Sequence, residues 1–301
     1  MAITSAMIKE LRERTGAGML DCKNVLTETD GNLEKAIDVL REKGLAKAAK
    51  KAGRIAAEGL VRIRLENGGG SASIIEVNSE TDFVAKNQEF IDFVEKLAEL
   101  APYAEDTDKF LEVSYDGGQS IGDKLTNFIA TIGENIGIRR FENLKRPGTV
   151  YVGYLHAGGK IGVVVGLETA ASVEEVTPLG RDIAMQIASM NPLFIDESQV
   201  DPAYMEKERE ILVQQALNEG KPADIVEKMV IGRLKKELKE TCLLEQKFVK
   251  NGELTVGQHL KDQVKALGKE ITVVEFVRYE VGEGIEKKTE NFAEEVAKQM
   301  Q

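Results

Sequence analysis

The chain has 301 residues, of which 42% are hydrophobic and 30% are charged, and its formal net charge is −11. This length suits one large or two to three ordinary domains, and the negative charge disfavours binding to nucleic acids or anionic membranes. Because no apolar run approaches the roughly 20 residues that span a bilayer, and the start lacks the layout of a signal peptide, we expect a cytoplasmic protein.

Residues 1–54 are predicted to form a small bundle of three helices. Apolar residues recur there at helical spacing in three blocks, which glycine-containing turns separate. The Ala-rich stretch 45–52 either prolongs the third helix or serves as a linker. A bundle this small indicates a docking module. Its apolar positions are Ile3, Met7, Ile8 and Leu11, then Met19, Leu20, Val25 and Leu26, then Leu33, Ala36, Ile37 and Leu40.

The next segment, 55–142, is predicted to combine a β-hairpin with helices. From Gly59 the apolar period changes to two, and the glycine-rich turn 67–70 separates two alternating runs. Amphipathic helices and a short strand follow. In chain order, the predicted elements are strands at 60–65 and 72–77, helices at about 84–101 and 121–133, and a strand at 136–141.

The same order of elements then recurs. A second hairpin lies about 90 residues after the first, whereas the second helix-to-strand step, at 267–271, lies about 135 residues after the step at 132–136. The second copy therefore carries an insertion of about 45 residues and is assigned to 143–195 and 246–281. Its predicted elements are strands at 150–155 and 161–167, a helix at 179–190 and a strand at 273–279.

The insertion, 196–245, is predicted to form an antiparallel helical hairpin. Its dense charge has helical periodicity, which breaks at 218–222. The expected contacts across the hairpin are made by Tyr204, Ile211 and Ala216 on one arm and by Ile225, Met229, Leu234 and Leu238 on the other. Residues 282–301 are expected to form a C-terminal module with a short helix at 292–300. Together these elements predict an α+β fold.

Several short motifs make the chain resemble the bacterial elongation factor Ts family along nearly its whole length. They are TGAGMLDCK at 15–23, TDFVAKN at 81–87, IGENI at 132–136, Arg139-Arg140 and EVGEGIEK at 280–287. The resemblance implies an N-terminal bundle similar to ubiquitin-associated domains (UBA-like), a core of two similar α+β halves with antiparallel sheets, an inserted coiled coil and a C-terminal module. The match is weakest from about 198 to 252.

The resemblance also implies a function. Members of this family act as guanine-nucleotide exchange factors that bind the GDP form of elongation factor Tu and release GDP by disturbing its magnesium and phosphate site. They form a heterodimer with that GTPase, and whether two heterodimers pair stays open. The family pattern implies a wedge at Thr81, Asp82, Phe83 and Val84, with further partner contacts at Arg12, Met19, Lys23, Lys51, Ile132, Gly133 and His156.

Asp82 and Phe83 also have a local explanation. Residues 79–82 read as a helix capping box, and Phe83 would then lie seven positions before Phe90 on one helical face. The equivalent place in the second copy, 168–171, has neither the acid nor the aromatic residue. Both explanations can hold together, if the helix start presents the pair at a protruding corner.

RNA binding is the main alternative from another class. Its basis is a run of basic residues. Such a run is also typical of a solvated helix face and linker, which is the alternative explanation. No aromatic residues are interleaved with these charges, as a single-strand binder would need. The run consists of Arg41, Lys43, Lys47, Lys50, Lys51, Arg54, Arg62 and Arg64.

The residue inventory disfavours catalysis. Neither Cys22 nor Cys242 shares a motif with His156 or His259, which are the two histidines of the chain. Two isolated cysteines make no zinc pattern, and both are expected to be reduced, at least half-buried thiols. The turn 68–70 joins two strands and lacks the sequence of a phosphate-binding loop. We therefore expect no catalytic residue, no cofactor, no metal and no direct nucleotide binding.

Overall fold

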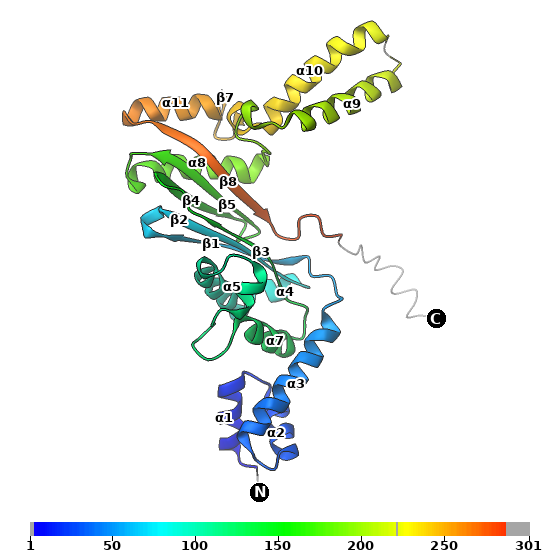
Figure 1. Cartoon of the computed structure of the whole chain (residues 1–301), viewed down its shortest axis with the longest axis vertical. Coiled ribbons are helices and arrows are strands. Elements are labelled where there is room, and N and C mark those ends of the chain that lie inside the picture. Colours follow the sequence, from blue (N-terminus) through cyan, green and yellow to red (C-terminus); the bar gives the residue numbers. More distant parts are fainter. Residues whose placement is uncertain (1–2, 221, 287–301) are drawn as a thin grey trace.

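The structure is a computed structural model that describes residues 3–220 and 222–286. The chain is elongated, with a helical bundle at one end, two stacked sheets with their helices in the middle, and a helical hairpin at the other end (Figure 1). The expected helix at 292–300 lies outside the described residues. Among the residues that are described, no helix is long and apolar enough to cross a membrane.

The N-terminal bundle contains α1 (Ser5–Thr15), α2 (Met19–Glu28) and α3 (Leu33–Lys51). The Thr4 side chain caps the start of α1, and Gly16 ends it in the left-handed conformation, φ 70°. The Ala-rich stretch prolongs α3 to Lys51, so it is part of the third helix and not a separate linker. Leu11, Cys22, Val25, Leu26 and Ala36 form the buried core.

The first α+β half is a three-stranded antiparallel sheet with helices on one face. Its strands β1 (Glu58–Glu66), β2 (Ser71–Ser79) and β3 (Gly137–Leu144) lie in the order β1-β2-β3, and the predicted hairpin is confirmed. The helices are α4 (Asp82–Ala85), α5 (Gln88–Leu100), α6 (Thr107–Glu112) and α7 (Ile121–Ile132). The prediction of one helix from 84 was wrong, because the Asn87 side chain caps a new helix by accepting from the Glu89 N–H.

The second half repeats this plan. Strands β4 (Thr149–His156), β5 (Ile161–Thr169) and β8 (Ile271–Glu280) form an antiparallel sheet in the order β4-β5-β8. The helices α8 (Val173–Met190) and α11 (Val256–Leu267) accompany it, and α8 begins earlier than predicted, at a capping box of Ser172 and Glu175. The predicted equivalence of the two helix-to-strand steps is confirmed, since α7 and α11 both end at a left-handed glycine, Gly133 and Gly268, before the third strand of their sheet.

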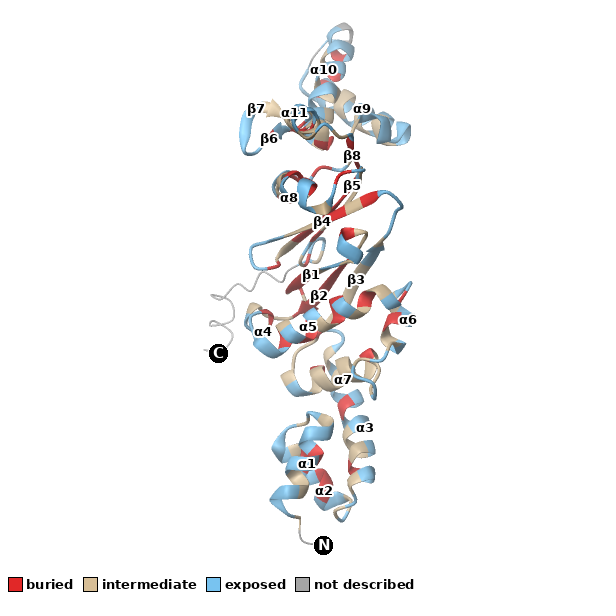
Figure 2. Ribbon diagram, turned by 90° about the vertical axis from the view of Figure 1, so that its left-hand side faces the viewer, coloured by how far each residue is buried: buried red, intermediate tan, exposed pale blue. Residues whose placement is uncertain are grey.

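The two sheets pack face to face, and the helices cover their outer faces (Figure 2). The layers are therefore helix, sheet, sheet, helix. Side chains alternate across each strand, so that Val61 of β1 points to the other sheet while its neighbour Leu60 packs under the helices. The residues buried between the sheets are Val61, Ala72, Ile74, Tyr151, Val164 and Tyr279.

The inserted segment folds as the predicted hairpin of α9 (Pro202–Asn218) and α10 (Ala223–Thr241), followed by the short strands β6 (Lys247–Phe248) and β7 (Asn251–Thr255). The predicted contacts of Ala216 and Leu234 are confirmed. The rest of the seam differs, because Val226 and Val230 are buried whereas the predicted Ile211 and Ile225 are 41% and 45% exposed. Adjacent apolar residues occur on two faces of each arm, so the helical period alone could not select the buried face.

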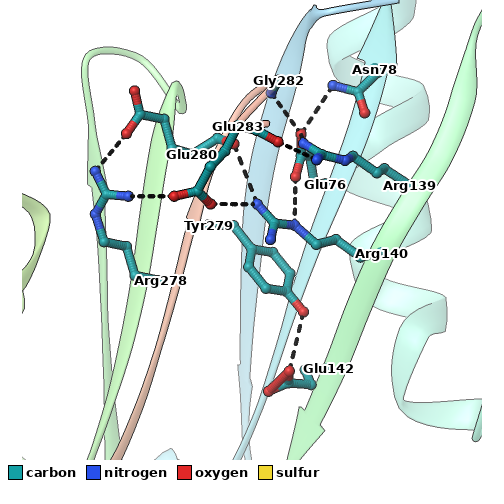
Figure 3. A network of polar contacts seen from close by, with 10 residues as sticks. All are labelled: Glu76, Asn78, Arg139, Arg140, Glu142, Arg278, Tyr279, Glu280, Gly282 and Glu283. Atoms are coloured by element: carbon teal, nitrogen blue, oxygen red, sulfur yellow. Dashed lines mark hydrogen bonds and ion pairs between the residues drawn. The ribbon is translucent and has the colours of Figure 1, made fainter. Parts of the chain in front are cut away.

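A buried carboxylate joins the two halves. Glu76 of β2 is fully buried and accepts hydrogen bonds from Arg139 at 2.9 Å and Arg140 at 2.7 Å, both on β3 (Figure 3). It also accepts the Gly282 N–H at 2.8 Å, just after β8 ends. Gly282 has φ 74°, and a Cβ there would lie 2.2 Å from the Ala57 carbonyl oxygen, so only glycine fits this turn. The end of β8 is thereby attached to the first sheet.

Candidate partner-binding site

The TDFV motif forms a corner where β2 turns into α4. Thr81 caps α4, since its side-chain oxygen accepts the Val84 N–H at 3.3 Å, and the Ser79 hydroxyl donates to the Thr81 carbonyl at 3.0 Å. The predicted capping box with Ser79 as the cap is therefore wrong, because the cap lies two residues later. A helix of four residues has too few internal bonds to be stable alone.

Phe83 projects from this corner into solvent. Its exposed fraction is 81%, the largest of any exposed large hydrophobic residue in the described part of the chain. Phe90 by contrast is fully buried, and the break at 86–87 separates the two residues, so the expectation that they share one buried helix face was wrong. Val84 is half-buried against the apolar core beneath α4. An exposed aromatic ring on a rigid corner is a typical anchor for a partner protein.

Asp82 pairs with Lys86 one turn later, at 2.6 Å. The hydrogen bond from Lys86 is the main reason that the pKa of Asp82 is lowered. Both side chains are open to solvent, so this pair contributes little to the stability of the fold. Asp82 is thus held as an ionised group beside Phe83.

The turn after α7 supports the corner. Glu134 accepts hydrogen bonds from the Thr81 N–H at 3.0 Å and from the Thr81 hydroxyl at 2.7 Å. This contact places the predicted residues Ile132 and Gly133 beside the motif. Sequence reasoning missed Glu134 as a supporting residue, although the IGENI motif that contains it had been singled out.

Lys51 belongs to the same neighbourhood. It is half-buried in the last turn of α3, and the chain that follows is held by Asn135, whose side-chain amide donates to the Arg54 carbonyl at 2.7 Å. Arg54 itself contacts Glu80 at 3.4 Å. These contacts connect the chain that follows α3 with the α7 turn and with Glu80, just before the TDFV corner.

The turn between β4 and β5 approaches from the second half. It packs on β1, where the Val61 N–H donates to the Gly159 carbonyl at 2.7 Å and Lys160 pairs with Glu58 at 2.6 Å. Lys160 and Glu58 both lie close enough to influence the pKa of Asp82. His156, at the end of β4, is exposed, and its Nδ1 lies 3.0 Å from the Tyr154 hydroxyl.

A second patch lies on the N-terminal bundle, at one end of the molecule (Figure 1). Three of the predicted partner contacts are exposed there: Arg12, Met19 and Lys23. Of the apolar positions of the second block, Val25 and Leu26 are buried, whereas Leu20 is 70% exposed and Met19 58%. Because the bundle lies at the end of the molecule and α4 lies in its middle, the structure does not bring this patch to the TDFV corner (Figure 1).

The basic stretch proposed for RNA is largely neutralised within the chain. Five of its eight members pair with carboxylates, which lowers the positive charge that this stretch offers to phosphates. The pairs are Arg41 with Asp123, Lys43 with Glu28, Lys47 with Asp21, Arg54 with Glu80, and Arg62 with Glu95.

Metal ligands and thiols were the remaining groups that the sequence analysis considered. Within 3–220 and 222–286, no group of three or more His, Cys, Asp or Glu side chains could hold a metal ion. Cys22 and Cys242 are both buried free thiols, as expected, and burial raises the pKa of each, so they stay protonated.

The repeated α+β core with an exposed aromatic corner and a separate apolar patch defines a protein-binding class of molecule. Comparison with known proteins points to one family. The family model described as Elongation factor TS matches residues 80–283, more than half of the chain. The chain is 57% identical to elongation factor Ts of Clostridioides difficile (strain 630) over 300 residues, covering 99% of both chains. It is 53% identical over 302 residues to that of Clostridium novyi (strain NT), again covering 99% of both. The chain belongs to the elongation factor Ts family and is thus a translation elongation factor.

Proposed function

We propose that this protein is the guanine-nucleotide exchange factor of elongation factor Tu in the cytoplasm, and that Phe83 acts as a wedge that loosens GDP. The observation that carries the proposal is the 81% exposed ring of Phe83 on a corner held from two sides. The family supplies the partner, and the corner supplies a group that fits the task. No chemical step on the factor itself is required.

The proposed mechanism is mechanical. Moving the Phe83 ring from water into the partner gains about 1.5 to 3 kcal/mol, which offsets part of the cost of shifting a helix there. Magnesium tolerates little departure from octahedral geometry, so such a shift weakens the magnesium and phosphate site that holds GDP. Factor and nucleotide then oppose each other through one reciprocal coupling free energy, which is the thermodynamic basis of exchange.

Other parts of the chain are assigned to binding. The UBA-like bundle, 1–54, docks on the GTPase through Arg12, Met19 and Lys23, and exposed Leu20 extends that patch. Near the wedge, the partner is contacted by His156, Lys51 and the Ile132-Gly133 turn.

The chain is divided into a core and attached parts. The core consists of the two halves, 55–142 and 143–195 with 246–281, while 196–245 is a peripheral hairpin and 282–301 is a C-terminal module. The complex is a 1:1 heterodimer.

The test compares two exposed aromatic residues. Phe83→Ala should lower the rate of fluorescent GDP release from elongation factor Tu at saturating factor, while binding, spread over several regions, survives in part. Tyr103→Ala is the matched control, because Tyr103 is 72% exposed and lies outside the proposed contacts. Both changes should leave the free energy of unfolding within about 0.5 kcal/mol of the original. If Phe83→Ala releases GDP from elongation factor Tu as fast as the original protein does, Phe83 is not the wedge.

A further inference from the structure

Glu134 is placed to hold the corner that carries Phe83. It lies directly after the left-handed Gly133 that ends α7, and its two carboxylate oxygens accept the N–H and the hydroxyl of Thr81 at 3.0 and 2.7 Å. The same hydroxyl oxygen caps α4 by accepting the Val84 N–H. The carboxylate is therefore linked through one threonine to the first turn of the helix that bears Phe83.

The contact is reciprocal. Glu134 accepts two hydrogen bonds from Thr81, and the neighbouring Asn135 N–H donates to the Glu80 carboxylate at 2.6 Å. Two consecutive residues after α7 thus bind two consecutive residues before α4. Because α4 has four residues, it depends on contacts from outside: Ala85 is buried beneath it, and these bonds hold its N-terminal side. Hydrogen bonds to a charged group are stronger than neutral ones, which suits this role.

The second half folds without a counterpart of the two Glu134–Thr81 hydrogen bonds, which we call the carboxylate bracket. In the second half the residue after the left-handed glycine is Lys269, which pairs instead with Glu175 of α8 at 2.8 Å. The corner there is closed by the Thr169 hydroxyl, which donates to the Glu270 carbonyl at 2.8 Å. The carboxylate bracket is found in the half that has Asp82 and Phe83, and the half without them has a lysine at that place.

We propose that Glu134 is the positioning residue of the exchange site: through Thr81 it holds α4 in the orientation that lets Phe83 enter the partner. The inference rests on the proposed function of Phe83 and adds to it a residue that does not itself touch the nucleotide site. Loss of the bracket should lower the maximal rate of GDP release more than the affinity, because the ring stays available while its direction is no longer maintained.

The experiment measures fluorescent GDP release from elongation factor Tu against factor concentration. Glu134→Ala should lower the maximal rate about tenfold and change the half-saturating concentration by less than about threefold. Glu134→Gln should recover most of the rate, because its amide oxygen accepts and its amide nitrogen donates to the hydroxyl. Thr81→Val, which removes the hydroxyl from the other side, should reproduce the loss. Lys269→Ala, the equivalent position in the second half, is the control and should release GDP at the original rate.

Two further measurements separate the possible outcomes. Hydrogen exchange of the amides at 82–86 in the free factor should be faster in Glu134→Ala. A variant with both Glu134→Ala and Phe83→Ala should be no slower in release than Phe83→Ala alone, because one residue acts through the other. Full release by Glu134→Ala, or losses that multiply in the double variant, would reject the positioning role while the wedge stands. Full release by Phe83→Ala would remove the wedge, and this inference with it.

Discussion

The guanidinium of Arg140 on β3 lies over the ring of Tyr279 on β8, 4.1 Å from its centroid. The third strand of one sheet thereby contacts the third strand of the other, beside the Glu76 cluster drawn in Figure 3. A cation over an aromatic face is stabilising where water is excluded. The planar guanidinium of Arg140 both lies over this ring and binds Glu76, and a lysine side chain could not make both contacts in this geometry.

Removing the carboxylate at the centre of this cluster should be costly. Glu76→Ala removes the shared partner of the partly exposed Arg139 and Arg140 and leaves the buried Gly282 N–H without its acceptor, and we expect a loss of about 1 to 3 kcal/mol in the free energy of unfolding. Urea unfolding at neutral pH measures it. Glu99→Ala, which removes an exposed carboxylate paired with Lys96, should change stability by less than about 0.5 kcal/mol. A Glu76→Ala protein as stable as the Glu99→Ala protein would contradict this prediction.

The same carboxylate should make stability depend on acid. Burial acts to raise the pKa of Glu76, but the hydrogen bonds from Gly282, Arg139, Asn78 and Arg140 outweigh it, so the pKa is lowered from its ordinary value of 4.5. The folded pKa is below the unfolded one, so the stabilisation is complete above pH 4.5 and is lost as the pH falls through the folded value. Urea midpoints measured downward from pH 6 should fall less steeply in Glu76→Gln than in the original protein.

Two helical glycines should respond oppositely to alanine. A Cβ at Gly180 of α8 would lie 2.5 Å from Val152 Cγ2, whereas one at Gly232 of α10 meets no atom within 4 Å. Gly180→Ala should therefore destabilise the protein by about 1 to 3 kcal/mol through overpacking. Gly232→Ala should stabilise its helix by about 0.5 to 1 kcal/mol. Thermal unfolding of the two variants side by side tests the difference in sign.

The N-terminal bundle should be removable without unfolding the core. Its buried residues form their own cluster, and it meets the core through α3 and α7, where Arg41 pairs with Asp123 at 2.7 Å. Deleting 1–54 should leave a folded core by circular dichroism and weaken binding to elongation factor Tu strongly in calorimetry. Unchanged affinity would show that Arg12, Met19 and Lys23 take no part.

The helical hairpin should be dispensable for exchange. Its seam of Ala216, Val226 and Val230 is separate from the core clusters, and the Leu193 N–H bonds the Thr241 carbonyl at 2.8 Å, which closes its base. Replacing 202–240 by a short Gly-Ser turn should leave a folded protein whose GDP release is unchanged. If the shortened protein folds but loses as much release as Phe83→Ala, the hairpin belongs to the exchange machinery.

Local sequence determined the elements and their order. Period-two and helical patterns, with glycines at the turns, located both hairpins, the helix-to-strand steps after Gly133 and Gly268, and the repeat with its insertion. These features depend on residues close together in the chain, where side-chain alternation and left-handed glycines act directly. The motifs TDFVAKN and IGENI also indicated the family, and both lie within the region that its model matches.

Tertiary structure alone decided which surfaces are covered. One of the two explanations drawn from the sequence placed Phe83 and Phe90 on the same face of one helix, yet a cap at Asn87 separates them and leaves Phe83 in solvent. The orientation of that ring depends on Glu134, 53 residues away from Thr81 along the chain. Periodicity reports which side of an element is apolar, but which elements meet there depends on packing between distant segments, and a local pattern carries no information about that.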